Sequence, residues 1–138
     1  MIKRLSILDM HVAIQNLIEE YSDLELLDGI PKNHPAPFTF FEIVEKVPDD
    51  TKTMFVDKFT IYIHIISKKE INDSSVPHYK NVQSIEEVFT KRMKLDEPFD
   101  IFRQSNEGII SNTVDETGER HAVLSMAFWV SYGFKVKI

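Results

Sequence analysis

The chain has 138 residues, no cysteine and a formal net charge of −6, from 22 acidic and 16 basic side chains. This length predicts a single domain over residues 1–138 with a core large enough to fold without disulfides or a metal, and the lack of cysteine excludes thiolate catalysis. The acidic balance, with basic residues scattered in twos and threes, argues against a specific nucleic-acid-binding protein, which would concentrate positive charge on one face.

Both ends of the sequence bear on localisation. Residues 1–11 contain two basic side chains but no apolar run of signal-peptide length before Asp9 and His11, so we expect no export by a conventional signal. Residues 121–138 are apolar, but they alternate with a period of two and include serines and lysines, which is typical of a strand and not of a membrane helix. The sequence therefore predicts no membrane association.

Residues 7–21 are predicted to form the first helix. Ser6 is a good N-cap, and Asp9 falls in the first turn, where the helix dipole favours negative charge. Apolar residues then recur at helical spacing at Met10, Ile14, Leu17 and Tyr21.

A loop and a β-hairpin are predicted next. Residues 24–27 are compatible with a short strand, and three prolines keep residues 31–37 extended. Residues 38–45 are rich in β-forming types and lead through a turn at 48–51 to a strand over residues 54–66. One face of that strand carries Phe55, Phe59, Ile61, Ile63 and Ile65.

A second helix and a second hairpin complete the predicted order. Caps at 73–75 and Pro77 in the first turn start the helix, which ends before Pro98. Its predicted apolar stripe is Tyr79, Val82, Ile85, Val88, Phe89 and Met93. A strand from Phe99 is broken or bulged at Gly108 and continues to Val114, and a turn at 115–118 leads into the strand over 121–138. One face of this last strand carries Ala122, Leu124, Met126, Phe128, Val130, Tyr132, Phe134 and Val136.

The order α-β-β-α-β-β predicts an α+β fold, in which two α-helices pack on one face of an antiparallel β-sheet of about four main strands in two hairpins. The opposite, helix-free face is expected to be more apolar and aromatic than a solvated surface requires. Its expected side chains are Phe41, Ile43, Val56, Lys58, Thr60, Tyr62, His64, Ser125 and Trp129.

The common catalytic, cofactor-binding and metal-binding motifs are missing from the sequence. The five histidines lack the spacing of a helical zinc site, and there is neither a Gly-x-Ser-x-Gly elbow nor a glycine-rich phosphate loop. Asp-Glu-Thr-Gly at 115–118 is better explained as a hairpin turn than as an aspartic-protease motif. A solvated hairpin tip best explains the acidic residues Glu42, Glu45, Asp49, Asp50 and Asp57. We therefore expect no enzyme, no cofactor and no metal.

Several segments spread over nearly the whole length carry a resemblance to a known family. They are residues 6–11, 37–42, 57–64, 115–124 and 132–135. In element order and strand texture they resemble the small tail-completion proteins of long-tailed bacteriophages (siphophages). The similar forms are the tail-terminator or tail-to-head joining proteins of Gram-positive prophages.

The resemblance implies a protomer without catalytic residues that assembles with itself, typically as a hexameric ring, at the end of the tail tube. Such a ring would stop tube polymerisation, contact the tail-tube and head-connector proteins, and let DNA pass. The protomer would be made in the cytoplasm of a bacterial host and end in the virion tail. The ring contacts would map onto the hairpin tips at 47–53 and 114–120 and onto the loop at 31–37.

Two groups of residues are the candidate functional sites. Tyr62, His64 and Trp129 form the candidate subunit interface. The candidate lumen or partner loops, whose negative charge would repel DNA phosphates, carry Asp49, Asp50, Asp115, Glu116 and Glu119, with Glu42 and Glu45 nearby. Two other classes stay open: a stand-alone binding or regulatory protein that uses the aromatic sheet face for an apolar ligand or partner, and a hydrolase with an unrecognised motif.

Overall fold

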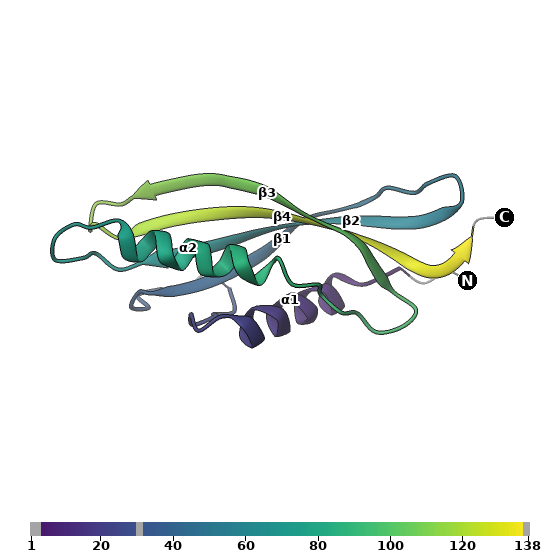
Figure 1. Cartoon of the computed structure of the whole chain (residues 1–138), viewed down its shortest axis with the longest axis horizontal. Coiled ribbons are helices and arrows are strands. Elements are labelled where there is room, and N and C mark those ends of the chain that lie inside the picture. The colour runs from purple at the N-terminus through teal and green to yellow at the C-terminus, as the bar shows by residue number, and fades with distance from the viewer. Residues whose placement is uncertain (1–3, 30–31, 137–138) are drawn as a thin grey trace.

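The computed structural model describes residues 4–29 and 32–136, with side chains as far as Tyr132. Its elements are α1 (Ile7–Tyr21), β1 (Phe38–Pro48), β2 (Met54–Ser67), α2 (Val76–Val88), β3 (Asp100–Val114) and β4 (Arg120–Val136). Figure 1 shows a long, twisted sheet with both helices on one side. The predicted α+β fold and its element order are confirmed.

The four strands lie in the order β1-β2-β4-β3, and every neighbouring pair is antiparallel. The central pair, β2 and β4, is matched from Met54 opposite Val136 to Ser67 opposite Arg120. The two edge strands are therefore β1 and β3. Outside the four strands, Leu26 forms an isolated parallel bridge with Thr39 of β1. This bridge lies within residues 24–27, for which the sequence predicts a short strand.

The main core lies between the helices and one face of the sheet. Ser6 caps α1 as predicted, since its hydroxyl accepts a hydrogen bond from the Asp9 amide at 3.0 Å. The helix buries Met10, Ile14, Leu17 and Ile18 against alternate residues of β2 and β4. The sheet side of this cluster includes Phe41, Phe59, Ile61, Ile63, Ile65, Leu124, Met126, Phe128 and Val130.

The buried face of α2 differs from the prediction by one residue. Tyr79 is 54% exposed, whereas His78 is buried, because its ring has polar partners on two strands. His78 Nδ1 lies 2.7 Å from Ser67 Oγ, and Nε2 lies 3.1 Å from Asn112 Oδ1. The helix also ends at Val88, so the buried Met93 lies beyond it. A buried histidine whose hydrogen bonds are satisfied can replace an apolar residue, and the apolar pattern alone does not reveal it.

The predicted faces of β1 are also exchanged. Phe41 pairs with Ile63 and Ile43 with Ile61, which places both on the helix-covered face. The helix-free face carries Phe38 and Phe40 instead. The prediction was wrong because apolar residues run without alternation from Phe38 to Phe41, so the sequence holds no period-two signal there.

The predicted irregularity of β3 is confirmed. Gly108 has φ 99°, and the pairing with β4 shifts between Asn106 and Gly108, as in a β-bulge. The predicted side-chain faces of β4 beyond Tyr132, including Phe134 and Val136, lie outside the described side chains. Pro31 of the predicted proline loop and residues 137–138 of the last strand lie outside the described residues.

Asp57 is the centre of a buried polar network and not part of a solvated hairpin tip. Its side chain is almost fully buried, with Oδ2 accepting from Tyr132 Oη at 2.7 Å and Oδ1 accepting from Arg4 Nη1 at 2.7 Å. Arg4 also reaches Asp50 Oδ2 at 3.4 Å. Burial, together with the neighbouring Asp57 carboxylate, raises the pKa of Tyr132. The network joins the segment before α1 to β2 and β4.

Tyr132→Phe tests the energetic role of this network. The substitution removes the hydroxyl that donates to a buried carboxylate, and hydrogen bonds to charged groups contribute about 1.5–3 kcal/mol. We expect the free energy of unfolding to fall by an amount in that range, measured by urea denaturation. Tyr62→Phe is the matched control, because Tyr62 lies half-buried on the other sheet face. Equal effects of the two substitutions would contradict a stabilising role for the Tyr132 hydroxyl.

Candidate assembly surface

The helix-free face of the sheet holds two small apolar clusters. One consists of Phe38, Phe40 and Ile66, against which Leu27 and Ala36 pack. The other consists of Val56, Ala127 and Trp129, with Met54 beside them. This face is thus largely closed by its own side chains, although no helix covers it (Figure 1).

Trp129 is held on this face by three polar side chains. The Arg103 guanidinium lies 4.3 Å from the indole ring centroid, and Lys58 Nζ lies 5.2 Å from it, so two cations contact its π-system. The indole N–H donates to Asp49 Oδ2 at 2.9 Å. Only 8% of Trp129 is exposed as a result.

A pair of histidines lies further along the same face. His64 Nδ1 is 2.9 Å from His121 Nε2, and the His64 ring stacks on Phe40 with centroids 4.4 Å apart and planes 4° apart. His64 Nε2 faces Glu42 Oε2 at 3.4 Å. Sequence spacing could not reveal this pair, because the two residues meet through the β2–β4 register.

The contact between the two rings needs one donor and one acceptor. His64 Nδ1 and His121 Nε2 lie 2.9 Å apart, so one of these nitrogens carries the proton that the other accepts. His64 Nε2 is buried and forms no hydrogen bond within the described residues, although the Glu42 carboxylate lies 3.4 Å away. Burial, and next the nearby His64, lower the pKa of His121.

The two acidic loops lie at opposite ends of the molecule (Figure 1). The turn that contains Asp49 and Asp50 follows β1, beside the Met54 end of β2, whereas the turn at 115–119 lies beside the Ser67 end. The 14 residues of β2 separate them by about 45 Å at ~3.3 Å per residue. The two groups of acidic residues therefore belong to two separate surfaces.

Several of these acidic side chains stabilise their own turns. Asp50 Oδ1 accepts from the Val56 amide at 2.8 Å, and Asp49 accepts from Trp129. Asp115 Oδ1 accepts from the Thr117 hydroxyl at 2.6 Å and from the amides of Thr117 and Glu119 at 2.9 and 3.0 Å. The bond from the hydroxyl, and next those from the backbone, lower the pKa of Asp115. Among the candidate loop acids, Glu116 and Glu119 have no side-chain hydrogen bond within the described residues.

The two edge strands, on opposite sides of the sheet, each carry exposed apolar side chains that the sequence prediction missed. Six of the thirteen large apolar side chains that are exposed in the described part of the chain lie on β1 and β3, and none lies on β2 or β4. They are Val44, Val47, Phe102, Ile109, Ile110 and Val114. The apolar pattern shows which residues alternate, but only the strand order shows which strands lie at an edge.

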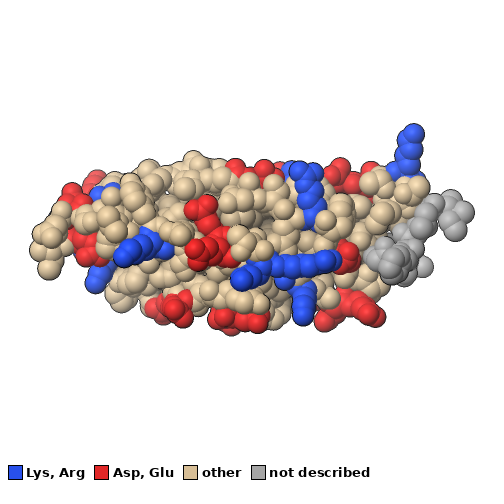
Figure 2. Space-filling model, in the orientation of Figure 1, with Lys and Arg blue, Asp and Glu red and all other residues tan. Residues whose placement is uncertain are grey.

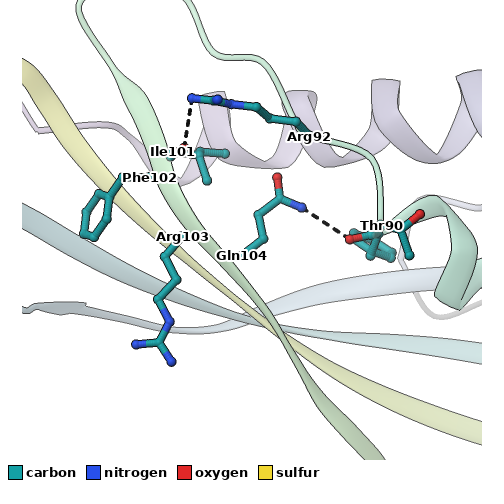
Figure 3. Close-up of a pocket in the computed structure, with 7 residues that line it drawn as sticks. Thr90, Arg92, Ile101, Phe102, Arg103 and Gln104 are labelled. Carbon is teal, nitrogen blue, oxygen red and sulfur yellow. Dashed lines mark hydrogen bonds between the residues drawn. The ribbon is translucent and has the colours of Figure 1, made fainter.

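A hollow of about 390 Å³ lies beside the first part of β3, at the end of α2. In Figure 3, Gln104 points toward the end of α2, where its amide donates to the Phe89 carbonyl at 3.3 Å, and Arg103 points away on the other side of the strand. Arg92 reaches the Ile101 carbonyl at 3.5 Å. Phe102, half-exposed, completes this rim, so the hollow opens along the edge of the sheet.

The charges and ligand types of the described residues point to no particular small ligand. On the face in Figure 2, basic and acidic side chains are interspersed. Residues 4–29 and 32–136 contain no group of three or more histidine or acidic side chains placed to hold a metal. Neither of the helices described is long and apolar enough to cross a membrane.

Comparison with known proteins identifies the family. The chain matches the phage tail terminator family, described as tail termination proteins, over residues 1–138. The chain belongs to the phage tail terminator family. It also has the fold of a chain in the virion of a native gene transfer agent particle, with a TM-score of 0.63 and 11% identity over 83% of this chain and 84% of that one. No curated protein sequence matches it.

Membership of the terminator family makes the protein a structural component of a phage-type virion tail. The predicted resemblance to tail-terminator proteins is therefore confirmed. That the parent phage is a siphophage of Gram-positive bacteria stays a prediction, as does assembly in the host cytoplasm.

Trp129→Ala is expected to destabilise this terminator protein as well as change its surface. The indole is buried among Val56, Ala127 and two cations. Truncating a buried tryptophan costs about 3–5 kcal/mol. Urea denaturation should show such a loss, with a smaller loss for Trp129→Phe. If Trp129→Ala is as stable as the unsubstituted protein, the packing of the indole does not stabilise the fold.

The stability of the terminator protein should fall as the pH drops from 7.5 to 5.5. Burial lowers the folded-state pKa of both His78 and His121 below the ordinary value of 6.5, so the unfolded chain takes up protons first. Protonation of the unfolded chain then favours unfolding, and stability is lost as the pH falls through 6.5.

The pH profile is measured by denaturation in a series of buffers. His121→Gln removes one of the two groups, so its stability should depend less steeply on pH in this window. His34→Gln is the control, because it also removes one histidine but leaves His78 and His121 in place. His34 lies on the loop before β1, where its Nε2 is 3.0 Å from Glu25 Oε2. If the stability of His121→Gln depends on pH as steeply as that of the unsubstituted protein, His121 does not contribute to the loss of stability at low pH.

Proposed function

We propose that this protein assembles as a hexameric ring that caps the tail tube, stops its polymerisation and joins it to the head connector. The observation that supports this function most directly is the match to the tail terminator family over residues 1–138. The open, partly apolar edges of β1 and β3 also suit a protein that completes its structure with other chains.

In this proposal the protein acts by assembly and without catalysis. Two of the buried polar groups have structural partners: Asp57 binds Arg4 and Tyr132, and His78 binds Ser67 and Asn112. The aromatic face offers less to an apolar ligand than the sequence suggested, because Trp129 is covered by Lys58 and Arg103. Assembly with tail proteins therefore remains the better-supported function.

The proposed subunit interface consists of Tyr62, His64 and Trp129. It can form only if subunits meet through their sheet faces. All three lie on the central strands β2 and β4, one or two strands away from either edge. Contact through them requires a partner that packs onto the face, whereas contact in the plane of the sheet uses β1 and β3.

Capping is tested by adding the purified protein to polymerising tail-tube protein of the same phage and measuring tube lengths by electron microscopy. The expected result is shorter tubes, each with added density at one end. Tubes of unchanged length and without end density would count against the proposed function. The number of subunits follows from the symmetry of the end density.

DNA passage is tested with Glu116→Lys combined with Glu119→Lys. The side chains of these exposed or half-buried acids make none of the hydrogen bonds of their turn, which the Glu119 backbone makes with Asp115, so the variant should fold and assemble normally. Positive charge beside a DNA channel would retain phosphates and lower infectivity in a complementation assay. Glu116→Gln with Glu119→Gln is the control for loss of negative charge alone. If the lysine variant is fully infective, the turn that contains Glu116 and Glu119 does not line the channel through which DNA would pass.

A further inference from the structure

A buried ring nitrogen on the helix-free face lacks a hydrogen-bond partner. Among the described residues, His64 Nε2 is the one buried side-chain nitrogen or oxygen atom without a hydrogen bond. Such atoms are rare in folded proteins and call for an explanation. The Glu42 carboxylate of β1 lies 3.4 Å from this nitrogen, and the Glu42 side chain is 41% exposed, whereas that of His64 is 15% exposed. The carboxylate can therefore move toward the nitrogen while the ring keeps its place.

The His64 ring is held in its orientation on both sides. On β1, Phe40 pairs with His64, and the two rings stack with their planes 4° apart. On β4, Val123 pairs with His64, and the next residue on the same face toward the start of that strand is His121, whose Nε2 lies 2.9 Å from His64 Nδ1. Turning the His64 ring over would place a carbon atom against His121. The ring therefore keeps Nε2 toward Glu42.

The contact between the two imidazoles limits how many protons the pair can hold. When both rings are neutral, one proton lies between His64 Nδ1 and His121 Nε2, whichever of the two carries it. When one ring is protonated on both nitrogens, it donates to the other ring and the contact persists. When both rings are protonated, two N–H groups face each other and the hydrogen bond is lost. The geometry thus accommodates one additional proton but not two.

The groups around the pair favour a positive charge on His64 and not on His121. An imidazolium at His64 has the Glu42 carboxylate beside it, and an opposite charge at this distance favours the charged form. Within the described residues, no carboxylate lies in ion-pair range of His121, and burial, then His64 and His78, lower its pKa, which Asp115 raises to a smaller extent. The titratable groups beside the pair come from β1, β2, α2 and the turn before β4: Glu42, Tyr62, His78 and Asp115. Of these, Glu42 alone brings a negative charge next to His64.

We infer that His64, His121 and Glu42 form a binding site for one proton, in which the His64 imidazolium donates to His121 through Nδ1 and to Glu42 through Nε2. The proton comes from water, and its uptake gives the unpartnered nitrogen an acceptor. It also links three strands, because Glu42 lies on β1, His64 on β2 and His121 on β4. The two imidazoles then take up protons in two separate steps. The site is a property of the single chain and does not depend on the proposed ring.

NMR titration of the histidines tests the site. The Hε1 and ring 15N shifts of His64 and His121 are followed from about pH 8 to about pH 5, a range that spans the ordinary titration of histidine. His64 should become protonated on both nitrogens first, and His121 should follow at lower pH. Glu42→Gln removes the counter-charge and should lower the proton affinity of His64 about threefold to tenfold, a shift of roughly 0.5–1 pH unit. Glu45→Gln is the matched control, because Glu45 lies further along β1, opposite Thr60, and should leave both steps unchanged.

The order of the two steps in the unsubstituted protein decides the inference even if a variant fails to fold. Two histidines that titrate together, or a His121 that is protonated before His64, would overturn it. Equal shifts of the His64 step in Glu42→Gln and Glu45→Gln would also overturn it, because they would reflect the general loss of one negative charge. His121→Gln should keep the His64 step, since the amide oxygen of glutamine can accept the hydrogen bond from Nδ1.

Discussion

The pairing of β2 with β4 is the constraint on which the rest of the structure depends. Both strands have a neighbouring strand on each side, so their backbone groups form hydrogen bonds within the sheet. The strands at the two edges are therefore β1 and β3. The same pairing brings His64 to His121 and Asp57 to the neighbourhood of Tyr132. It also fixes the two acidic turns at opposite ends, because each lies beside a different end of β2.

Buried polar groups then hold the helices and the segment before α1 to this central pair. An unpaired carboxylate in the position of Asp57 would be costly, but Arg4 and Tyr132 both donate to it. His78 links α2 to the end of β2 and to β3 in a similar way, through Ser67 and Asn112. These contacts specify how the helices sit on the sheet, which apolar packing alone would leave less well defined.

The sequence predicts the elements of this fold well, because Ser6, Gly108 and the alternation in β2 and β4 are local signals. It fails at Phe38–Phe41, where the apolar run has no period, and at His78, where a polar residue is buried because two strands supply hydrogen bonds. The candidate sites depend more strongly on three-dimensional pairing. Sequence reasoning placed Trp129 on the helix-free face, but it could not show that Arg103, Lys58 and Asp49 would cover it.

The position of the acidic turns matters for any ring built from this protomer. Copies related by rotation about one axis present the same end of the sheet on the same side of the ring. With strands running between the two rims, the turn of Asp49 and Asp50 lies at one rim and the turn of Glu116 and Glu119 at the other (Figure 1). The first turn is fixed by Arg4 and Trp129, whereas in the second turn the side chains of Glu116 and Glu119 take no part in the hydrogen bonds, which use the Asp115 side chain and the backbone. Such a ring would have two chemically different rims, which suits the proposed position between a tail tube and a head connector.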